Sequence, residues 1–141
     1  MTAILQHDAT LADSDWYLQV HSTSPLLRPE TIAAGLAALE SSPEHDSLFS
    51  VTRLQTRLYD ADCRPVNHDP AVLLRTQDLS PLYEENSGMY VFSREQIAKG
   101  RRFGDRPLLF EIDPLEATDI DEEPDFLLAD TLHRMQREGL L

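Results

Sequence analysis

The feature that most constrains the fold is a strand–helix–strand pattern in the first third of the chain. Residues 15–20 are mostly aromatic and aliphatic, which is typical of a buried strand. Pro29 suits the first position of a helix, and apolar residues recur at helical spacing from Ile32 to Leu39. Residues 47–51 predict a second strand. Elements of these lengths predict a right-handed βαβ unit with parallel strands.

The middle of the chain predicts an excursion away from a parallel sheet. In residues 52–92, short apolar runs alternate with turn sequences rich in Asp, Asn and Pro, which favours antiparallel pairing. Residues 88–92 predict a strand that returns to the sheet. Ser93 and Gln96 have the spacing of a capping box and predict a short helix.

The last third of the chain completes the pattern with a strand at residues 108–112 and a final helix. Pro124 suits the start of that helix, and Gly139 suits its end. The sequence therefore predicts one α/β domain over residues 1–141. We expect a partial Rossmann-like, mostly parallel sheet with helices on both faces and an antiparallel insertion at about residues 52–92.

Composition limits the partners and the compartment. Twenty-five Asp and Glu against twelve Lys and Arg give a formal net charge of −13, and the basic residues are scattered, which disfavours nucleic acid as a partner. Cys63 is the single cysteine, so no disulfide can form within the chain. No apolar stretch has the length of a membrane span, and no signal-peptide pattern is present. We expect a cytoplasmic protein without a membrane partner.

The turn from His21 to Pro25, with the sequence HSTSP, is the first candidate site. It follows a predicted strand and precedes a predicted helix, which is where open α/β sheets bind ligands. The hydroxyls of Ser22 and its neighbours can donate to a sugar or a phosphate. The alternative is that Thr23 and Ser24 only stabilise the turn and that His21 has a structural partner.

A second candidate site lies between Arg75 and Asn86. The guanidinium of Arg75 is a natural partner for a carboxylate, because it forms two parallel charge-assisted hydrogen bonds. Gln77 and Asn86 can hydrogen-bond hydroxyl or amide groups. The alternative is a surface salt bridge from Arg75 to Asp78 or Glu84.

Asp119 and Asp121 form the third candidate site. In an extended segment, alternation directs both carboxylates to one side, where they can hold Mg²⁺ together with substrate phosphates. The alternative is that the acids stabilise the N-terminus of the final helix through its dipole, which explains Glu122, Glu123 and Asp125 better than it explains Asp119.

In this order, HSTSPLL, RTQDL, YEENSGMYVF and DIDEEPDF resemble the acylneuraminate cytidylyltransferase family. Members of that family transfer CMP from CTP to a sialic acid or a related 2-keto sugar acid and release pyrophosphate. The resemblance implies CTP and a sugar acid as substrates, Mg²⁺ as cofactor, and a homodimer in which residues 52–92 reach into the partner subunit.

The resemblance also implies a role for each candidate residue. His21 stands where many members have a glutamine that contacts the sugar, so it marks a departure. Arg75 matches the arginine near the sugar carboxylate, and the same region is lined by Gln77, Asn86 and Tyr90. Asp119 and Asp121 match the catalytic Asp-x-Asp pair that binds the metal.

The glycine-rich, basic phosphate loop with which family members begin has no match here, since none of the five glycines forms such a loop. Met1 aligns with the interior of a full-length member, so the resemblance covers only the C-terminal part of the family. Two functions stay open: a cytidylyltransferase completed by a front half, and a non-catalytic, dimerising sugar-acid-binding remnant. A Mg²⁺-dependent enzyme of another kind is disfavoured, because no nucleophilic Asp follows a strand near the start of the chain.

Overall fold

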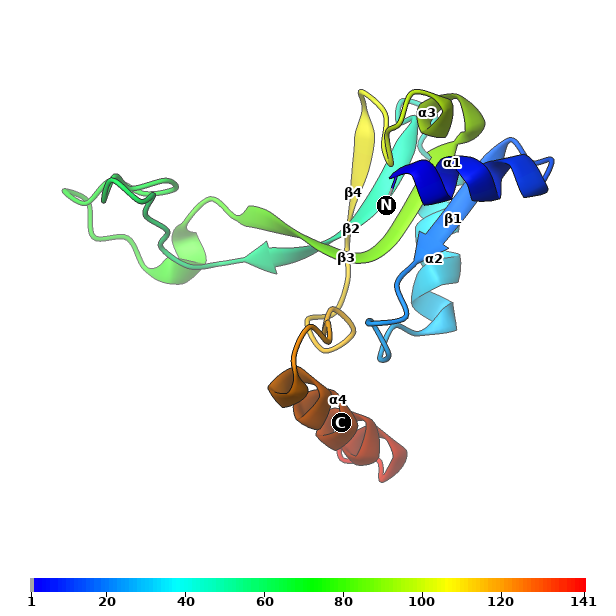
Figure 1. Cartoon of the computed structure of the whole chain (residues 1–141). Helices are drawn as coiled ribbons and strands as arrows, with labels where there is room; N and C mark the ends of the chain where they lie inside the picture. Colours follow the sequence, from blue (N-terminus) through cyan, green and yellow to red (C-terminus); the bar gives the residue numbers. More distant parts are fainter. Residues whose placement is uncertain (1) are drawn as a thin grey trace.

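The computed structural model describes residues 2–141 as an α/β fold built on one four-stranded sheet (Figure 1). The predicted strands and helices are confirmed, although several differ in length from the prediction. In chain order, the elements are α1 (Thr2–Leu11), β1 (Trp16–Val20), α2 (Pro29–Glu40), β2 (Ser47–Leu54), the 3₁₀ helix η1 (Thr76–Asp78), β3 (Leu82–Ser93), α3 (Arg94–Ala98), β4 (Pro107–Glu111) and α4 (Glu123–Arg137).

The sheet has the order β1-β3-β2-β4, and β3 is antiparallel to both of its neighbours. Within residues 2–141, the one parallel ladder joins β2 to β4. The sheet is therefore mixed, and the prediction of a mostly parallel sheet is wrong for its ladders. β1 and β2 do run in the same direction, since both are antiparallel to β3. A helical crossover sets the direction of the strands that it joins, but it leaves room for a third strand between them.

Helices cover both faces of the sheet, as the sequence predicts. Met89 and Val91 of β3 belong to the apolar cluster packed by α2, and Tyr90 and Phe92 belong to the cluster packed by α1 and α3. This alternation follows from the two-residue period of a strand. Gly35 allows α2 to approach closely, because a Cβ there would lie 2.4 Å from the terminal methyl of Met89.

Residues 55–81 project from the sheet as an arm, carried outward by the ends of β2 and β3 (Figure 1). Residues 51–54 pair with residues 82–85 in an antiparallel ladder, which confirms the predicted antiparallel excursion. Between these strands, the structure shows only η1 and an isolated bridge from Tyr59 to Pro65. The use of the arm for dimerisation stays a prediction.

α4 lies apart from the helices that cover the sheet (Figure 1). It begins with Glu123 and Pro124, as predicted, and a capping box joins Glu122 to Asp125. Gly139 follows the helix with a φ of 69°, a conformation that glycine adopts without strain. None of the helices between residues 2 and 141 combines the length and the apolar character needed to cross a bilayer.

An ion pair between the exposed Arg28 and the buried Glu116 joins the start of α2 to the segment between β4 and α4. Glu116 is only 2% exposed, and it accepts hydrogen bonds from the backbone N–H of Arg28 at 3.0 Å and from Arg28 Nε at 2.8 Å. Burial by itself raises the pKa of Glu116, but the hydrogen bonds from Arg28 and Thr31 hold it below its ordinary value. The pair therefore stabilises the folded chain in its ionised form.

We predict that Glu116→Gln lowers the free energy of unfolding at neutral pH by about 1–3 kcal/mol, because a charge-assisted contact is lost at a buried site. The folded pKa of Glu116 lies below its unfolded value of about 4.5, so this stabilisation is present above pH 4.5 and is lost as the pH falls through the folded pKa. Urea unfolding between pH 3 and pH 7 measures both effects. The exposed Glu40→Gln is the control, and equal stability of the two variants would contradict the prediction.

Candidate functional site

Two of the predicted segments meet at one edge of the sheet. Because β1, β2 and β4 run in one direction, their carboxyl ends share an edge, here called the carboxyl edge, where open α/β sheets bind ligands. His21 follows β1 at this edge. The backbone N–H of Ile120 donates to the carbonyl of Thr23 at 2.9 Å, so the HSTSP turn contacts the segment that holds Asp119 and Asp121.

His21 and Tyr90 lie side by side at the carboxyl edge. Tyr90 is opposite Gln19 in the ladder between β1 and β3, and its ring centroid is 6.2 Å from that of His21. His21 Nε2 is 2.8 Å from Gln19 Nε2. Ser22 is exposed in the turn that follows. The structure thus brings together three of the predicted residues: His21, Ser22 and Tyr90.

Tyr90 is completely buried beneath a charged pair. Its hydroxyl donates to Glu85 and lies 3.2 Å from Ser87 Oγ, while the guanidinium carbon of Arg102 lies 4.2 Å from the ring centroid. Arg102 Nη2 is also 3.6 Å from Glu85 Oε1. Burial, followed by the hydrogen bond to Glu85, raises the pKa of the Tyr90 phenol above its ordinary value, so the phenol stays protonated at neutral pH.

Asn86 is engaged within the protein. Its Oδ1 accepts a hydrogen bond from Ser50 Oγ at 2.6 Å, and its Nδ2 donates to Thr52 Oγ1 at 3.0 Å. Ser50 Oγ in turn accepts from the backbone N–H of Met89 at 2.8 Å. These bonds satisfy the polar groups at the point where the register between β2 and β3 shifts. In this structure Asn86 therefore fixes the irregular stretch of β3, and its role in binding a substrate stays a prediction.

Asp119 and Asp121 differ in their surroundings. Asp119 is partly buried and its Oδ1 accepts from the backbone N–H of Ile120 at 3.1 Å, whereas Asp121 is exposed. The backbone N–H groups of Asp121 and Glu122 both donate to Asp125, at 3.2 and 2.9 Å. The capping interpretation therefore holds for Glu122 and Asp125 and does not account for Asp119.

The binding of magnesium by the two aspartates stays a prediction. Within residues 2–141, no group of three or more His, Cys, Asp or Glu side chains is placed to hold a metal ion. Carboxylate oxygens are nevertheless the ligands that Mg²⁺ prefers, and it is usually bound through one or two carboxylates together with waters and substrate phosphates. By ligand type, Asp119 and Asp121 would suit such a site only together with a phosphate.

Arg75 and Gln77 lie on the arm, away from the end of β1 (Figure 1). Arg75 forms two hydrogen bonds with Asp78, at 2.8 and 3.1 Å, and its side chain is 72% exposed. Within one chain, Arg75 thus forms the surface salt bridge to Asp78 that the sequence analysis gave as the alternative. An ion pair as exposed as this one contributes little to stability. Gln77 is exposed in η1. The structure does not bring these two residues to His21 in the same chain.

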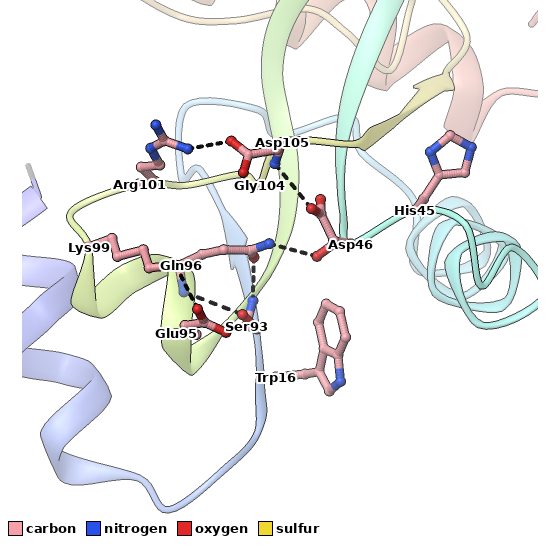
Figure 2. A pocket seen from close by; sticks show the side chains of 10 residues that line it. All are labelled: Trp16, His45, Asp46, Ser93, Glu95, Gln96, Lys99, Arg101, Gly104 and Asp105. Carbon is pink, nitrogen blue, oxygen red and sulfur yellow. Dashed lines mark hydrogen bonds and ion pairs between the residues drawn. The ribbon is translucent and has the colours of Figure 1, made fainter.

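A cavity of about 390 Å³ lies at the opposite edge of the sheet, where β1, β2 and β4 begin (Figure 2). Its charged lining residues are largely paired with each other, as in the ion pairs of Lys99 with Glu95 and Arg101 with Asp105, both at 2.6 Å. The cavity lies away from the carboxyl edge, so the topology does not favour it as the ligand site.

Asp46 lines this cavity and accepts hydrogen bonds from the residues next to it (Figure 2). Its carboxylate accepts from Ser47 Oγ at 3.0 Å and from the backbone N–H groups of Asp105 and Arg106 at 3.1 and 3.2 Å. Partial burial raises the pKa of Asp46, but these hydrogen bonds outweigh it and hold the pKa below its ordinary value. Asp46 thereby fixes the loop that precedes β4.

The sequence prediction missed Glu85 and Arg102. Glu85 belongs to the YEENSG segment but carried no assigned role, and Arg102 lies in a segment that the resemblance places in a surface loop. Both residues contact Tyr90, Glu85 from the same strand β3 and Arg102 from the segment between α3 and β4. The sequence does not mark these contacts, because the first depends on the irregular stretch of β3 and the second on the path of the segment after α3.

Comparisons with known proteins show which family the sequence resembles. A sequence model of the cytidylyltransferase family matches residues 2–137. The chain is similar to N-acylneuraminate cytidylyltransferase A of Danio rerio, with 28% identity over 123 residues. The aligned region covers 82% of this chain and 28% of that relative, so the chain spans less than a third of the relative's length.

We predict that Asp46→Ala lowers the free energy of unfolding by about 1–3 kcal/mol, because it leaves the backbone donors of residues 105 and 106 without their acceptor. Urea unfolding at neutral pH measures the change. The control is Asp105→Ala, which removes an exposed carboxylate from the same cavity and is expected to change stability by less than about 1 kcal/mol. An effect of Asp46→Ala no larger than that of the control would contradict the role given to Asp46.

Proposed function

Because this chain belongs to the cytidylyltransferase family, we propose that it forms the sugar-acid side of an enzyme that transfers CMP from CTP to a sialic-acid-type 2-keto sugar acid. The observation that carries the proposal is the contact between Ile120 and Thr23, which brings the polar turn after β1 against the segment of Asp119 and Asp121. The name of the similar Danio rerio protein supports an acylneuraminate as the sugar acid.

The proposed reaction is attack of the anomeric hydroxyl on the α-phosphate of CTP, in line with the departing pyrophosphate. The barrier of such a transfer is mostly orientation and charge. In the proposal, His21 and Ser22 hydrogen-bond sugar hydroxyls and so orient the acceptor. Asp119 and Asp121 hold Mg²⁺, which when bound supplies positive charge to the phosphates. This charge is needed locally, because the protein carries a formal net charge of −13.

The arm is proposed to act in a homodimer. Arg75 and Gln77 are exposed on the arm, and its apolar residues Val66, Val72 and Leu73 are more than half exposed. Apolar side chains gathered on a projecting segment favour an interface with another chain. In such a dimer, Arg75 can exchange its exposed contact with Asp78 for the carboxylate of a sugar acid held by the partner, because its guanidinium binds carboxylates through two hydrogen bonds.

A second candidate function is a dimerising sugar-acid-binding protein without catalysis. It is favoured by the exposed apolar residues Val66, Val72 and Leu73 of the arm, because dimerisation and sugar binding do not require a bound nucleotide. Both candidates require the same sugar-acid pocket. They differ in whether CTP becomes a substrate once a nucleotide-binding front half is supplied.

The proposal predicts that the 141-residue chain binds N-acetylneuraminate but releases no pyrophosphate when CTP and Mg²⁺ are added. Binding is expected because the polar turn lies against the segment of Asp119 and Asp121, and turnover is not expected because no phosphate loop holds the triphosphate. Ligand-observed NMR and a pyrophosphate assay measure the two outcomes. His21→Ala is expected to weaken binding about tenfold, equivalent to about 1.4 kcal/mol. His133→Ala on the exposed face of α4 is the matched control.

Absence of binding by the unaltered chain would overturn the proposal. Pyrophosphate release that disappears in Asp119→Asn would show that the chain catalyses the transfer by itself, which contradicts the expected inactivity. Equal affinity of His21→Ala and the unaltered chain would show that His21 does not bind the sugar acid.

The homodimer is tested separately by light scattering. We expect a mass of two chains in solution, and we expect Leu73→Asp to shift it towards one chain, because a buried charge without a partner destabilises an interface. Leu73 is 92% exposed in the single chain, so the substitution leaves the fold intact. Leu11→Asp, at an exposed apolar residue outside the arm, is the control. A single-chain mass for the unaltered protein would contradict the role of the arm.

A further inference from the structure

The hydroxyl of Tyr90 is fully used within the protein. Its single proton goes to Glu85, so the contact of 3.2 Å with Ser87 is one in which the Ser87 hydroxyl donates. The Tyr90 side chain is also completely buried. Tyr90 therefore cannot contact a sugar directly in this arrangement, although the family resemblance places it in the sugar region.

Glu85 and Arg102 are charged residues that contact Tyr90. Their side chains are 39% and 29% exposed, so each is held by the protein and still reaches water. The guanidinium of Arg102 lies over the Tyr90 ring at 4.2 Å, a geometry in which the ring face attracts the cation. The phenol proton fixes Glu85 on the other side. Both charges are thus oriented by the same buried ring.

The same ring contacts His21, with the two centroids 6.2 Å apart. A carboxylate that accepts, a guanidinium that donates and an imidazole therefore all contact the same buried ring. This combination matches the neighbouring hydroxyl groups of a sugar, each of which both donates and accepts a hydrogen bond. A partly buried charge pair is also a weak source of stability, so packing alone gives little reason to place it there.

We infer that Glu85 and Arg102 form a charged wall of the sugar-acid pocket and bind hydroxyl groups of the sugar, with Tyr90 as the positioning residue behind them. The inference rests on the proposed function, since it names further ligand-binding residues of the same site. Tyr90 then acts only by positioning Glu85 and Arg102. The hydroxyl groups of the sugar contribute to its affinity in addition to its carboxylate.

The test titrates the full chain and its variants with N-acetylneuraminate and follows binding by NMR. Glu85→Gln and Arg102→Gln are each expected to raise the Kd about tenfold, because each removes a charge-assisted hydrogen bond to the sugar. Glu95→Gln and Arg101→Gln are the matched controls. They make the same changes of charge at exposed ion pairs that do not touch Tyr90, and they are expected to leave the Kd unchanged.

Thermal unfolding of every variant shows whether the fold is retained. Glu85→Gln is the safer variant in this respect, because the amide oxygen still accepts the Tyr90 proton. If the unaltered chain binds and both variants at the wall bind equally well, the inference is wrong and the proposed function stands. If the unaltered chain does not bind, the proposed function and the inference both fail.

Discussion

The antiparallel placement of β3 at the centre of the sheet is the constraint on which the rest of the structure depends. β3 pairs with β1 on one side and β2 on the other, and its alternating side chains supply both apolar clusters. Because β3 runs against its neighbours, it brings Tyr90 beside the end of β1 and carries the arm outward at its own start. The candidate site and the arm are therefore both consequences of one strand.

Two polar contacts fix the backbone around the candidate site. The Ser50–Asn86 hydrogen bond satisfies buried groups where the ladder between β2 and β3 shifts register, just before β3 places Tyr90. The buried Glu116 binds Arg28 and fixes the segment after β4 against the start of α2. The HSTSP turn precedes Arg28 and Asp119 follows Glu116 within a few residues, so the ion pair fixes both segments close to the contact between Thr23 and Ile120.

Several elements could be predicted because their signals are local. Pro29 and the apolar period after it define α2, Ser93 and Gln96 form the predicted capping box, and Pro124 marks the start of α4. The motif order also sufficed to identify the family, because it depends on residue types and spacing. The pairing of β1 with β3 could not be predicted in this way. Nothing in the sequence of residues 15–20 or 88–92 specifies which strand each segment pairs with.

The sequence by itself determined the elements, the family and the polar residues of the proposed site. The tertiary structure decided which of these residues meet. It placed His21 beside Tyr90 and the HSTSP turn against the segment of Asp119, it bonded Asn86 to Ser50, and it brought Glu85 and Arg102 into contact with Tyr90. The physical reason is that contacts between distant residues depend on strand order and loop path, which hydrophobic periodicity and capping do not specify.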